Sequence, residues 1–178
     1  QPLRERRERV EGGSFPCSAP RQCLLHRDPA HSQGGALQAT TSLRNRSSGQ
    51  LWRLQRRTTC LSRAVVYYIL CPCREARDYV GSTLDMRRRW SKHKSDVRKE
   101  NWANCGLTRH FELCHLGDME HALARLQVTL LDHLQGDFSE EGLLQLEKDW
   151  IVNMGTFGPL GMNSRDQLLS RTRRDWGR

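Results

Sequence analysis

The sequence has no long apolar stretch and few aromatic residues. No segment approaches the roughly 20 consecutive apolar residues that a helix needs to cross a bilayer, so we expect no membrane partner. Hydrophobic residues make up 37% of the chain and aromatic residues 7%, so part of the chain is expected to lie outside a packed core. The chain starts at Gln1 with an Arg-rich segment and no apolar leader. We therefore expect a piece of a longer protein with no visible secretory signal.

Acidic residues are scarce relative to basic ones. Twenty Asp and Glu stand against 29 Lys and Arg, which gives a net charge of +9. A basic domain attracts polyanions by releasing their counterions, and nucleic acid is the commonest partner of this kind. A solvated basic surface is the alternative, and charge alone does not separate the two. A DNA partner would place the protein inside the cell, in the nucleus.

Seven cysteines, an odd number, accompany seven histidines. Without a secretory signal, this usage favours metal ligation or free thiols over a framework of disulfides. Residues 1–59 are predicted to be a basic, largely disordered extension, because the segment 32–50 is rich in Ser, Thr, Gly and Gln. Within the extension, Cys17, Cys23 and His26 form a candidate metal knuckle. Together with Cys60 they could form a zinc cluster, although their spacing is loose.

The composition changes at about residue 60, where a domain over 60–165 begins. The apolar, β-branched run 64–70 predicts a buried strand, and residues 71–78 read as a turn. Tyr79 and Val80 start a second short strand, which Gly81 is expected to stop. The two strands form a hairpin.

Helical spacing follows the hairpin. Ser82 or Thr83 is expected to cap a helix that runs to about Lys99. A short helix follows within 101–116, alternation over 126–131 predicts a third strand, and apolar spacing predicts a last helix over 140–154. Residues 166–178 are a basic tail. The predicted fold class is α+β, a small three-stranded antiparallel sheet flanked by helices in the order β-β-α-β-α.

An ordered set of motifs in this domain resembles the GIY-YIG nuclease family. Val65-Val66-Tyr67, followed after eleven residues by Tyr79-Val80-Gly81, is similar to the hairpin that names the family. An arginine eight residues after Gly81 and a histidine four residues further on match its first helix. The segment 146–151 resembles the last helix, with its metal-binding glutamate, and 158–163 the closing segment, with its asparagine. The family's first glycine is Val65 here, which changes the first strand but removes no catalytic group.

The resemblance implies that the domain cuts DNA phosphodiesters with one divalent metal. It implies catalytic roles for six residues: Tyr67, Tyr79, Arg89, His93, Glu147 and Asn163. It is compatible with DNA contacts from residues of the first helix and the glycine before it: Gly81, Arg87, Arg88, Lys92 and Lys94. Register favours Arg89 over its two arginine neighbours, because it lies one helical turn before His93.

Each implied role has a structural alternative. Tyr67 would be the general base, but a free phenol has a pKa of about 10, so it needs a nearby cation or a metal-bound water; otherwise it is a core tyrosine. Tyr79 would hydrogen-bond near the phosphate, with the same alternative. Arg89 would clamp the scissile phosphate bidentately, or else lie on a solvated basic face. His93 would contact phosphate or orient the nucleophile, or else be a satisfied, half-buried histidine.

Glu147 would bind Mg²⁺ or Mn²⁺. Its helical neighbours Leu143 and Ile151 place its carboxylate on or beside an apolar face, where a charge is costly without a metal or another cation. Asn163 would frame the site, or merely hydrogen-bond to its own backbone after a Gly-Pro turn.

Four further residues suit a tetrahedral zinc ion: Cys71, Cys73, His110 and His115. Zinc would tie the hairpin to the short helix predicted within 101–116, the helical insert. Cys105 or Cys114 could substitute as a ligand. The alternative is a set of free thiols. A Cys-Cys-His-His insertion in a GIY-YIG domain resembles the endonuclease of Penelope-like retroelements. That resemblance implies single-strand nicking for integration and a reverse transcriptase in the same parent polyprotein.

Two other functions remain open at this point. The first is a zinc-bearing, DNA-binding module whose catalytic chemistry has decayed. The second is structure-specific incision in DNA repair, which would use the same site on a different substrate.

Overall fold

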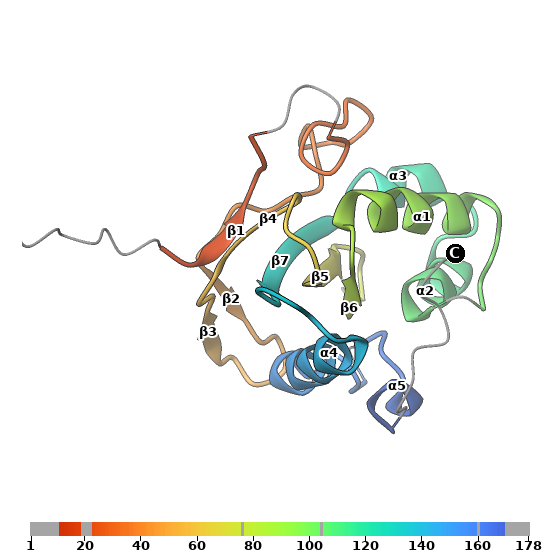
Figure 1. Cartoon of the computed structure of the whole chain (residues 1–178). Helices are drawn as coiled ribbons and strands as arrows, with labels where there is room; N and C mark the ends of the chain where they lie inside the picture. Colours follow the sequence, from red (N-terminus) through yellow and green to blue (C-terminus); the bar gives the residue numbers. More distant parts are fainter. Residues whose placement is uncertain (1–10, 19–22, 76, 104, 160, 170–178) are drawn as a thin grey trace, which may run out of the picture.

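The computed structural model describes residues 11–18, 23–75, 77–103, 105–159 and 161–169. The charged run near the N-terminus and the basic tail from residue 170 onward lie outside these residues. The described chain has the predicted small α+β architecture, with helices packed on a central antiparallel sheet (Figure 1). In this part of the chain, no helix combines the length and the apolar character that crossing a membrane requires.

The central sheet consists of three strands. The apolar run forms β5 (Val65–Cys71), which lies in the middle between β6 (Arg77–Thr83) and β7 (Gln127–His133), and both pairings are antiparallel. Apolar clusters cover β5 on both faces, which explains why nearly every residue of this strand is buried. The second strand does not stop at Gly81 as predicted, because Gly81 pairs with Tyr67 inside the ladder.

The two faces of this sheet carry separate apolar clusters. Side chains alternate along a strand, so Tyr67 and its cross-strand neighbours face one side, and Val66 and Tyr68 face the other. The Tyr67 face packs against Trp90 from the first helix and Phe111 from the helical insert that follows it. The opposite face packs against α4 (Glu140–Met154). Figure 1 shows α1 and α4 on opposite sides of the sheet.

The first helix, α1 (Met86–Arg98), begins later than predicted. Asp85 is its N-cap, and the Asp85 side chain accepts a hydrogen bond from the backbone N–H of Arg88. Ser82 and Thr83 are not caps, because both still belong to β6. Two short helices follow, α2 (Gly106–Cys114) and α3 (Met119–Leu123), of which the sequence predicts only the first.

The last long helix has the predicted bounds. Its N-cap is Ser139, whose hydroxyl accepts a hydrogen bond from the N–H of Gly142. The helix ends at Gly155, which adopts the left-handed conformation that glycine accommodates without steric cost. A short helix, α5 (Arg165–Leu169), completes the described chain.

The N-terminal segment has four short strands where composition favours disorder. β1 (Gly13–Phe15) pairs in parallel with β4 (Arg57–Thr59), and β2 (Ser42–Arg44) pairs in antiparallel orientation with β3 (Leu51–Arg53). The backbone on either side of Leu37 also pairs with β7: the N–H of Val128 donates to the carbonyl of Ala36 at 2.8 Å. The segment thus covers the free edge of the central sheet.

Candidate active site

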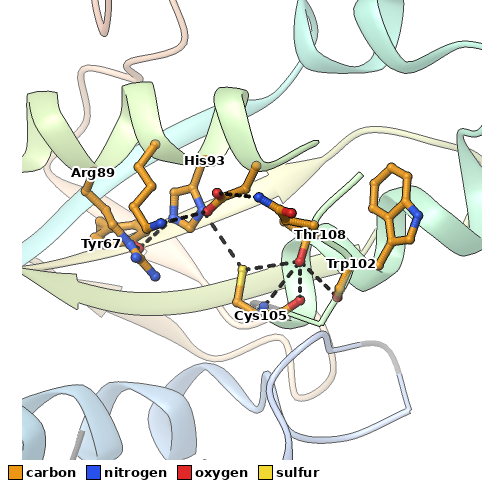
Figure 2. A network of polar contacts seen from close by, with 9 residues as sticks. Tyr67, Arg89, His93, Trp102, Cys105 and Thr108 are labelled. Atoms are coloured by element: carbon orange, nitrogen blue, oxygen red, sulfur yellow. Dashed lines mark hydrogen bonds and ion pairs between the residues drawn. The ribbon is translucent and has the colours of Figure 1, made fainter. Parts of the chain in front are cut away.

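Tyr67 lies at the centre of the candidate site. Its side chain is fully buried, and its hydroxyl oxygen lies 2.8 Å from Nε2 of His93. The Nε–H of Arg89 donates to the same oxygen at 3.1 Å. Arg89 and His93 are four residues apart on α1, so both side chains leave the helix on one face, toward the strand (Figure 2). The structure therefore brings the predicted base, phosphate clamp and histidine into direct contact.

The Tyr67 hydroxyl has a cation and an imidazole as its neighbours. Tyr67 lies beside the Arg89 guanidinium and raises its pKa. This effect outweighs the opposing effect of burial, so Arg89 stays charged. A fixed cation at hydrogen-bond distance stabilises a phenolate, and a neutral imidazole nitrogen can accept the phenol proton. Arg89 uses only its Nε–H on Tyr67, which leaves the planar end of the guanidinium available for a second oxyanion.

Tyr79 completes an aromatic cluster on the same face. Its ring centroid lies 6.3 Å from that of Tyr67 and 6.1 Å from that of His93. Burial raises the pKa of Tyr79 well above its ordinary value, with Tyr67 as the next contribution, so Tyr79 stays protonated and can donate a hydrogen bond. The backbone of Gly81 lies against both tyrosines: a Cβ there would meet the Tyr67 hydroxyl oxygen at 2.6 Å. Glycine is therefore required at this point of the strand.

Glu147 reaches the sheet from the opposite face. Its side chain is 4% exposed, and its carboxylate accepts a hydrogen bond from the hydroxyl of Ser82 on the edge strand β6. Ser82 pairs with Val66, so its side chain points toward α4, away from the face that carries Tyr67. The carboxylate nevertheless lies close enough to Tyr79 to contribute to the raised pKa of that hydroxyl, after the larger contributions of burial, Tyr67 and Cys105. The carboxylate and the tyrosine cluster thus approach the same edge strand from its two faces.

Asn163 pairs with the backbone of the edge strand. Its Oδ1 accepts from the N–H of Val80 at 2.9 Å, and its Nδ2 donates to the carbonyl of Val80 at 2.7 Å. Just before it, the N–H of Met162 donates to the carbonyl of Asp78. The closing segment therefore lies along the outer edge of β6 and satisfies its backbone, which places Asn163 in the frame of the site.

The predicted DNA-contacting residues have different surroundings. Arg87, Arg88 and Lys92 are exposed on α1, and Lys92 forms an ion pair with Asp96 at 3.5 Å. Lys94 is buried and forms an ion pair with Asp28 of the N-terminal segment at 2.8 Å. Lys94 is thus directed toward the N-terminal segment and is not exposed for DNA as predicted, because its ammonium group is paired with Asp28.

Comparison with known families settles the class of this domain. A family model for the GIY-YIG catalytic domain matches residues 63–158, which is more than half of the chain. The chain belongs to the GIY-YIG family. Membership implies a nuclease, a hydrolase with DNA as its substrate. No match was found to a curated protein or to a solved structure.

The GIY-YIG domain also contains a Cys/His group with metal-ligand geometry. It consists of the four predicted zinc ligands, whose ligand atoms all lie within 4.8 Å of one another: Cys71, Cys73, His110 and His115. Sγ of Cys71 lies 3.4 Å from Nε2 of His115, and the two imidazole Nε2 atoms are 3.3 Å apart. Ordinary zinc bond lengths give tetrahedral edges of about 3.6 Å between sulfur and nitrogen and about 3.3 Å between nitrogens. The group therefore fits one zinc ion.

The protonation of this group suits a metal ligand set. Burial, followed by the neighbouring His115 and Arg77, lowers the pKa of His110 to about 4, so its imidazole is neutral at neutral pH. Burial raises the pKa of Cys71 to about 12, so a thiolate at this position needs a cation beside it. The other candidate ligands, Cys105 and Cys114, lie outside the group.

Sequence reasoning missed two polar neighbours of the GIY-YIG site. Ser82 donates to Glu147, and Sγ of Cys105 lies 4.0 Å from Nδ1 of His93. The alternation of β6 carried a signal for Ser82, since its side chain must face away from Tyr79 and toward whichever helix covers that side. Cys105 lies 12 residues after His93, just before α2, and no periodic pattern in the sequence connects the two residues.

Proposed function

We propose that this chain is a metal-dependent DNA endonuclease that nicks one strand at a time. The observation that carries the proposal is the Tyr67 hydroxyl held between the Arg89 guanidinium and the His93 imidazole. A buried phenol flanked by a cation and a base is suited to proton transfer. One site per chain accounts for one cut per bound molecule.

In the proposed reaction, His93 accepts the proton of the Tyr67 hydroxyl through Nε2. The resulting phenolate, stabilised by Arg89, removes a proton from the attacking water. The free guanidinium N–H groups of Arg89 hold two oxygens of the scissile phosphate and balance the charge that builds up as the water adds. Tyr79, protonated, donates a hydrogen bond toward the same phosphate.

Glu147 is the proposed metal ligand. A buried carboxylate beside the Ser82 hydroxyl offers hard oxygen donors, the type that Mg²⁺ and Mn²⁺ prefer, and Mg²⁺ commonly takes only one or two carboxylates and keeps several waters. When bound, the ion would supply a Lewis acid that stabilises the leaving oxygen. Asn163 keeps the edge strand in place between Glu147 and the tyrosines.

The Cys/His group shared by the hairpin and the helical insert supports a finer proposal. We infer that zinc at Cys71, Cys73, His110 and His115 holds α2 against the hairpin, and that the chain is a retroelement-type nicking enzyme acting in the nucleus. A reverse transcriptase in the same parent polyprotein would use the nick as a primer.

A second candidate function is a zinc-bearing, DNA-binding module without catalysis. Two separate groups of Cys and His with ligand geometry favour it, because zinc modules bind DNA without any need for a tyrosine base.

Nicking of a supercoiled plasmid tests the catalytic proposal. Wild type should convert the plasmid to nicked circles with Mg²⁺ and not with a chelator, and Glu147→Gln should reduce the rate by roughly 100-fold or more. The variant keeps an oxygen that can accept from Ser82, so the fold is retained. Glu141→Gln, which changes an exposed carboxylate in the first turn of the same helix, should cut like wild type. Equal cutting by wild type and Glu147→Gln would remove Glu147 from the mechanism, and no cutting by either, with zinc-dependent DNA binding retained, would establish the second candidate instead.

A further inference from the structure

A second group of metal-ligand side chains lies outside the GIY-YIG match. It consists of three cysteines and one histidine whose ligand atoms all lie within 4.8 Å of one another: Cys17, Cys23, His26 and Cys60. The first three come from the N-terminal segment, whereas Cys60 immediately follows β4 and lies just before the domain's first strand. The chain therefore brings together two stretches that are 34 residues apart in sequence.

The distances within this group suit a tetrahedral ion. Sγ of Cys23 lies 3.4 Å from Sγ of Cys60, and Nδ1 of His26 lies 3.4 Å from Sγ of Cys60 and 3.8 Å from Sγ of Cys17. Ordinary zinc bond lengths give edges of about 3.8 Å between sulfurs and about 3.6 Å between sulfur and nitrogen. One imidazole nitrogen and three sulfurs thus converge on one point.

The chemistry of the group favours a metal over a disulfide. All three thiols are buried, with 7%, 2% and 2% of Cys17, Cys23 and Cys60 exposed, and none of the chain's seven described cysteines is disulfide-bonded. A disulfide between Cys23 and Cys60 would not explain why Cys17 and His26 lie beside them. A soft cation, in contrast, uses all four ligands, and thiolates with imidazole select zinc.

The neighbouring contacts show what such an ion would hold in place. The N-terminal segment covers the free edge of the sheet at β7: the Val128 N–H donates to the Ala36 carbonyl, and the Leu130 N–H donates to the Ser14 hydroxyl at 3.1 Å. His31 adds a hydrogen bond to the carbonyl of Leu126 at 2.8 Å. The segment has few apolar residues with which to secure these contacts, so an additional cross-link has a clear physical use.

We propose that Cys17, Cys23, His26 and Cys60 form a structural zinc site that clasps the N-terminal segment onto the edge of the nuclease sheet. Binding replaces three thiol protons, released to solvent, with three zinc–sulfur bonds, and the His26 nitrogen gives the fourth bond. The ion closes the loop between His26 and Cys60 and fixes β1 and β4 beside β7. The site is complete with four protein ligands, so it has no open position for catalysis. It does not depend on the nuclease activity.

Zinc content of the full chain tests the proposal. The double variant Cys71→Ser/Cys73→Ser removes the thiolates of the other Cys/His group and should retain one zinc ion per chain, measured by elemental mass spectrometry after dialysis. Adding Cys60→Ser should remove that ion. Adding Cys114→Ser, an exposed thiol outside both groups, should leave it bound. Retention of zinc in the Cys60→Ser combination, or a Cys23–Cys60 disulfide in the reduced, zinc-loaded protein, overturns the proposal.

X-ray absorption at the zinc edge of the unmodified chain gives an answer that does not depend on how any variant folds. Two filled sites predict five sulfur and three nitrogen ligands over two ions, whereas the helical-insert site alone predicts two of each over one. Hydrogen exchange tests the clasp itself. In Cys60→Ser the amides of Val128 and Leu130 should exchange at least about tenfold faster, while that of Tyr68, inside the β5 ladder, keeps its rate. Unchanged exchange at Val128 and Leu130 rules out the clasp.

Discussion

The hydroxyl oxygen of Tyr67 lies 2.8 Å from Nε2 of His93, and the same oxygen accepts the Nε–H of Arg89. One phenol is thus held by both a base and a fixed cation, each from the same face of α1. In the proposed mechanism the tyrosine has two functions that a packing residue lacks: it releases its proton, and it positions the arginine. Removing the hydroxyl alone separates these functions from the packing of the ring.

Tyr67→Phe should therefore abolish cutting while leaving the fold intact. The ring still fills its buried site, but the relay between His93 and water is lost, which costs roughly 10²- to 10⁴-fold in rate. Single-turnover plasmid nicking measures the effect, and circular dichroism checks the fold. Tyr68→Phe is the matched control, because its hydroxyl donates to Asp78 on the opposite face of the sheet. A Tyr67→Phe enzyme that cuts at the Tyr68→Phe rate would remove Tyr67 from the mechanism.

Gly81→Ala should impair both cutting and stability. A Cβ at this position would meet the Tyr67 hydroxyl oxygen at 2.6 Å and a ring carbon of Tyr79 at 2.8 Å, so at least one ring must move. Forcing such a shift in a packed strand costs about 1–3 kcal/mol, and displacing the hydroxyl weakens its contacts with α1. Urea unfolding and nicking rates measure the two effects. Gly117→Ala, where an added Cβ meets nothing within 4 Å, should match wild type in both.

Gly81 also marks where sequence reasoning reaches its limit. Apolar spacing gave the bounds of α4, because each turn of that helix buries a residue against the sheet. The same rules read Gly81 as the end of a strand, whereas close approach of two tyrosine rings explains it inside the strand. That approach depends on the partner strand, which local pattern does not contain.

Long-range pairing explains the other differences. Residues 32–50 have few apolar side chains. Ala36 and Leu37 are nevertheless ordered, because their backbone pairs with Val128 at the edge of β7, about 90 residues further along the chain. The family resemblance implied that Tyr67, Arg89 and His93 share one site, and one strand and one helix face bring all three together. The contact between Ser82 and Glu147 depends on which helix covers the second face, so spacing alone could not predict it.

Cys73→Ser should release zinc from the helical insert and lower the melting temperature. Sγ of Cys73 lies 3.6 Å from Nε2 of His110 on α2, so the ion would link this helix to the end of the hairpin. Structural zinc sites contribute on the order of 10 kcal/mol of apparent binding free energy, much of which becomes folding free energy. Differential scanning calorimetry with and without zinc measures the loss. Cys114→Ser should keep both the zinc and the melting temperature, and equal losses in the two variants would contradict the assigned ligands.

The carboxyl group of Asp78 should make the free energy of unfolding depend on pH between about 4 and 6. Burial raises the pKa of Asp78 to about 6 from a model-peptide value of 3.8, although the hydrogen bond from Tyr68 opposes the shift. The folded state therefore binds this proton more tightly than the unfolded state. Its contribution to the free energy of unfolding is fully present below about pH 4 and is lost as the pH rises through about 6. The loss is on the order of 2 to 3 kcal/mol.

Asp78→Asn removes the titration and keeps an oxygen that accepts from Tyr68. Urea unfolding of wild type and variant between pH 4 and pH 8 gives the difference in their free energies of unfolding, in which the slopes of all other titrating groups cancel. That difference should grow in favour of the asparagine variant as the pH rises from about 4 to 6 and then stay level. A difference that stays flat over this range would show that the buried carboxyl titrates as it does in the unfolded chain, and a difference of opposite sign would show that the ionised form is the one the fold stabilises.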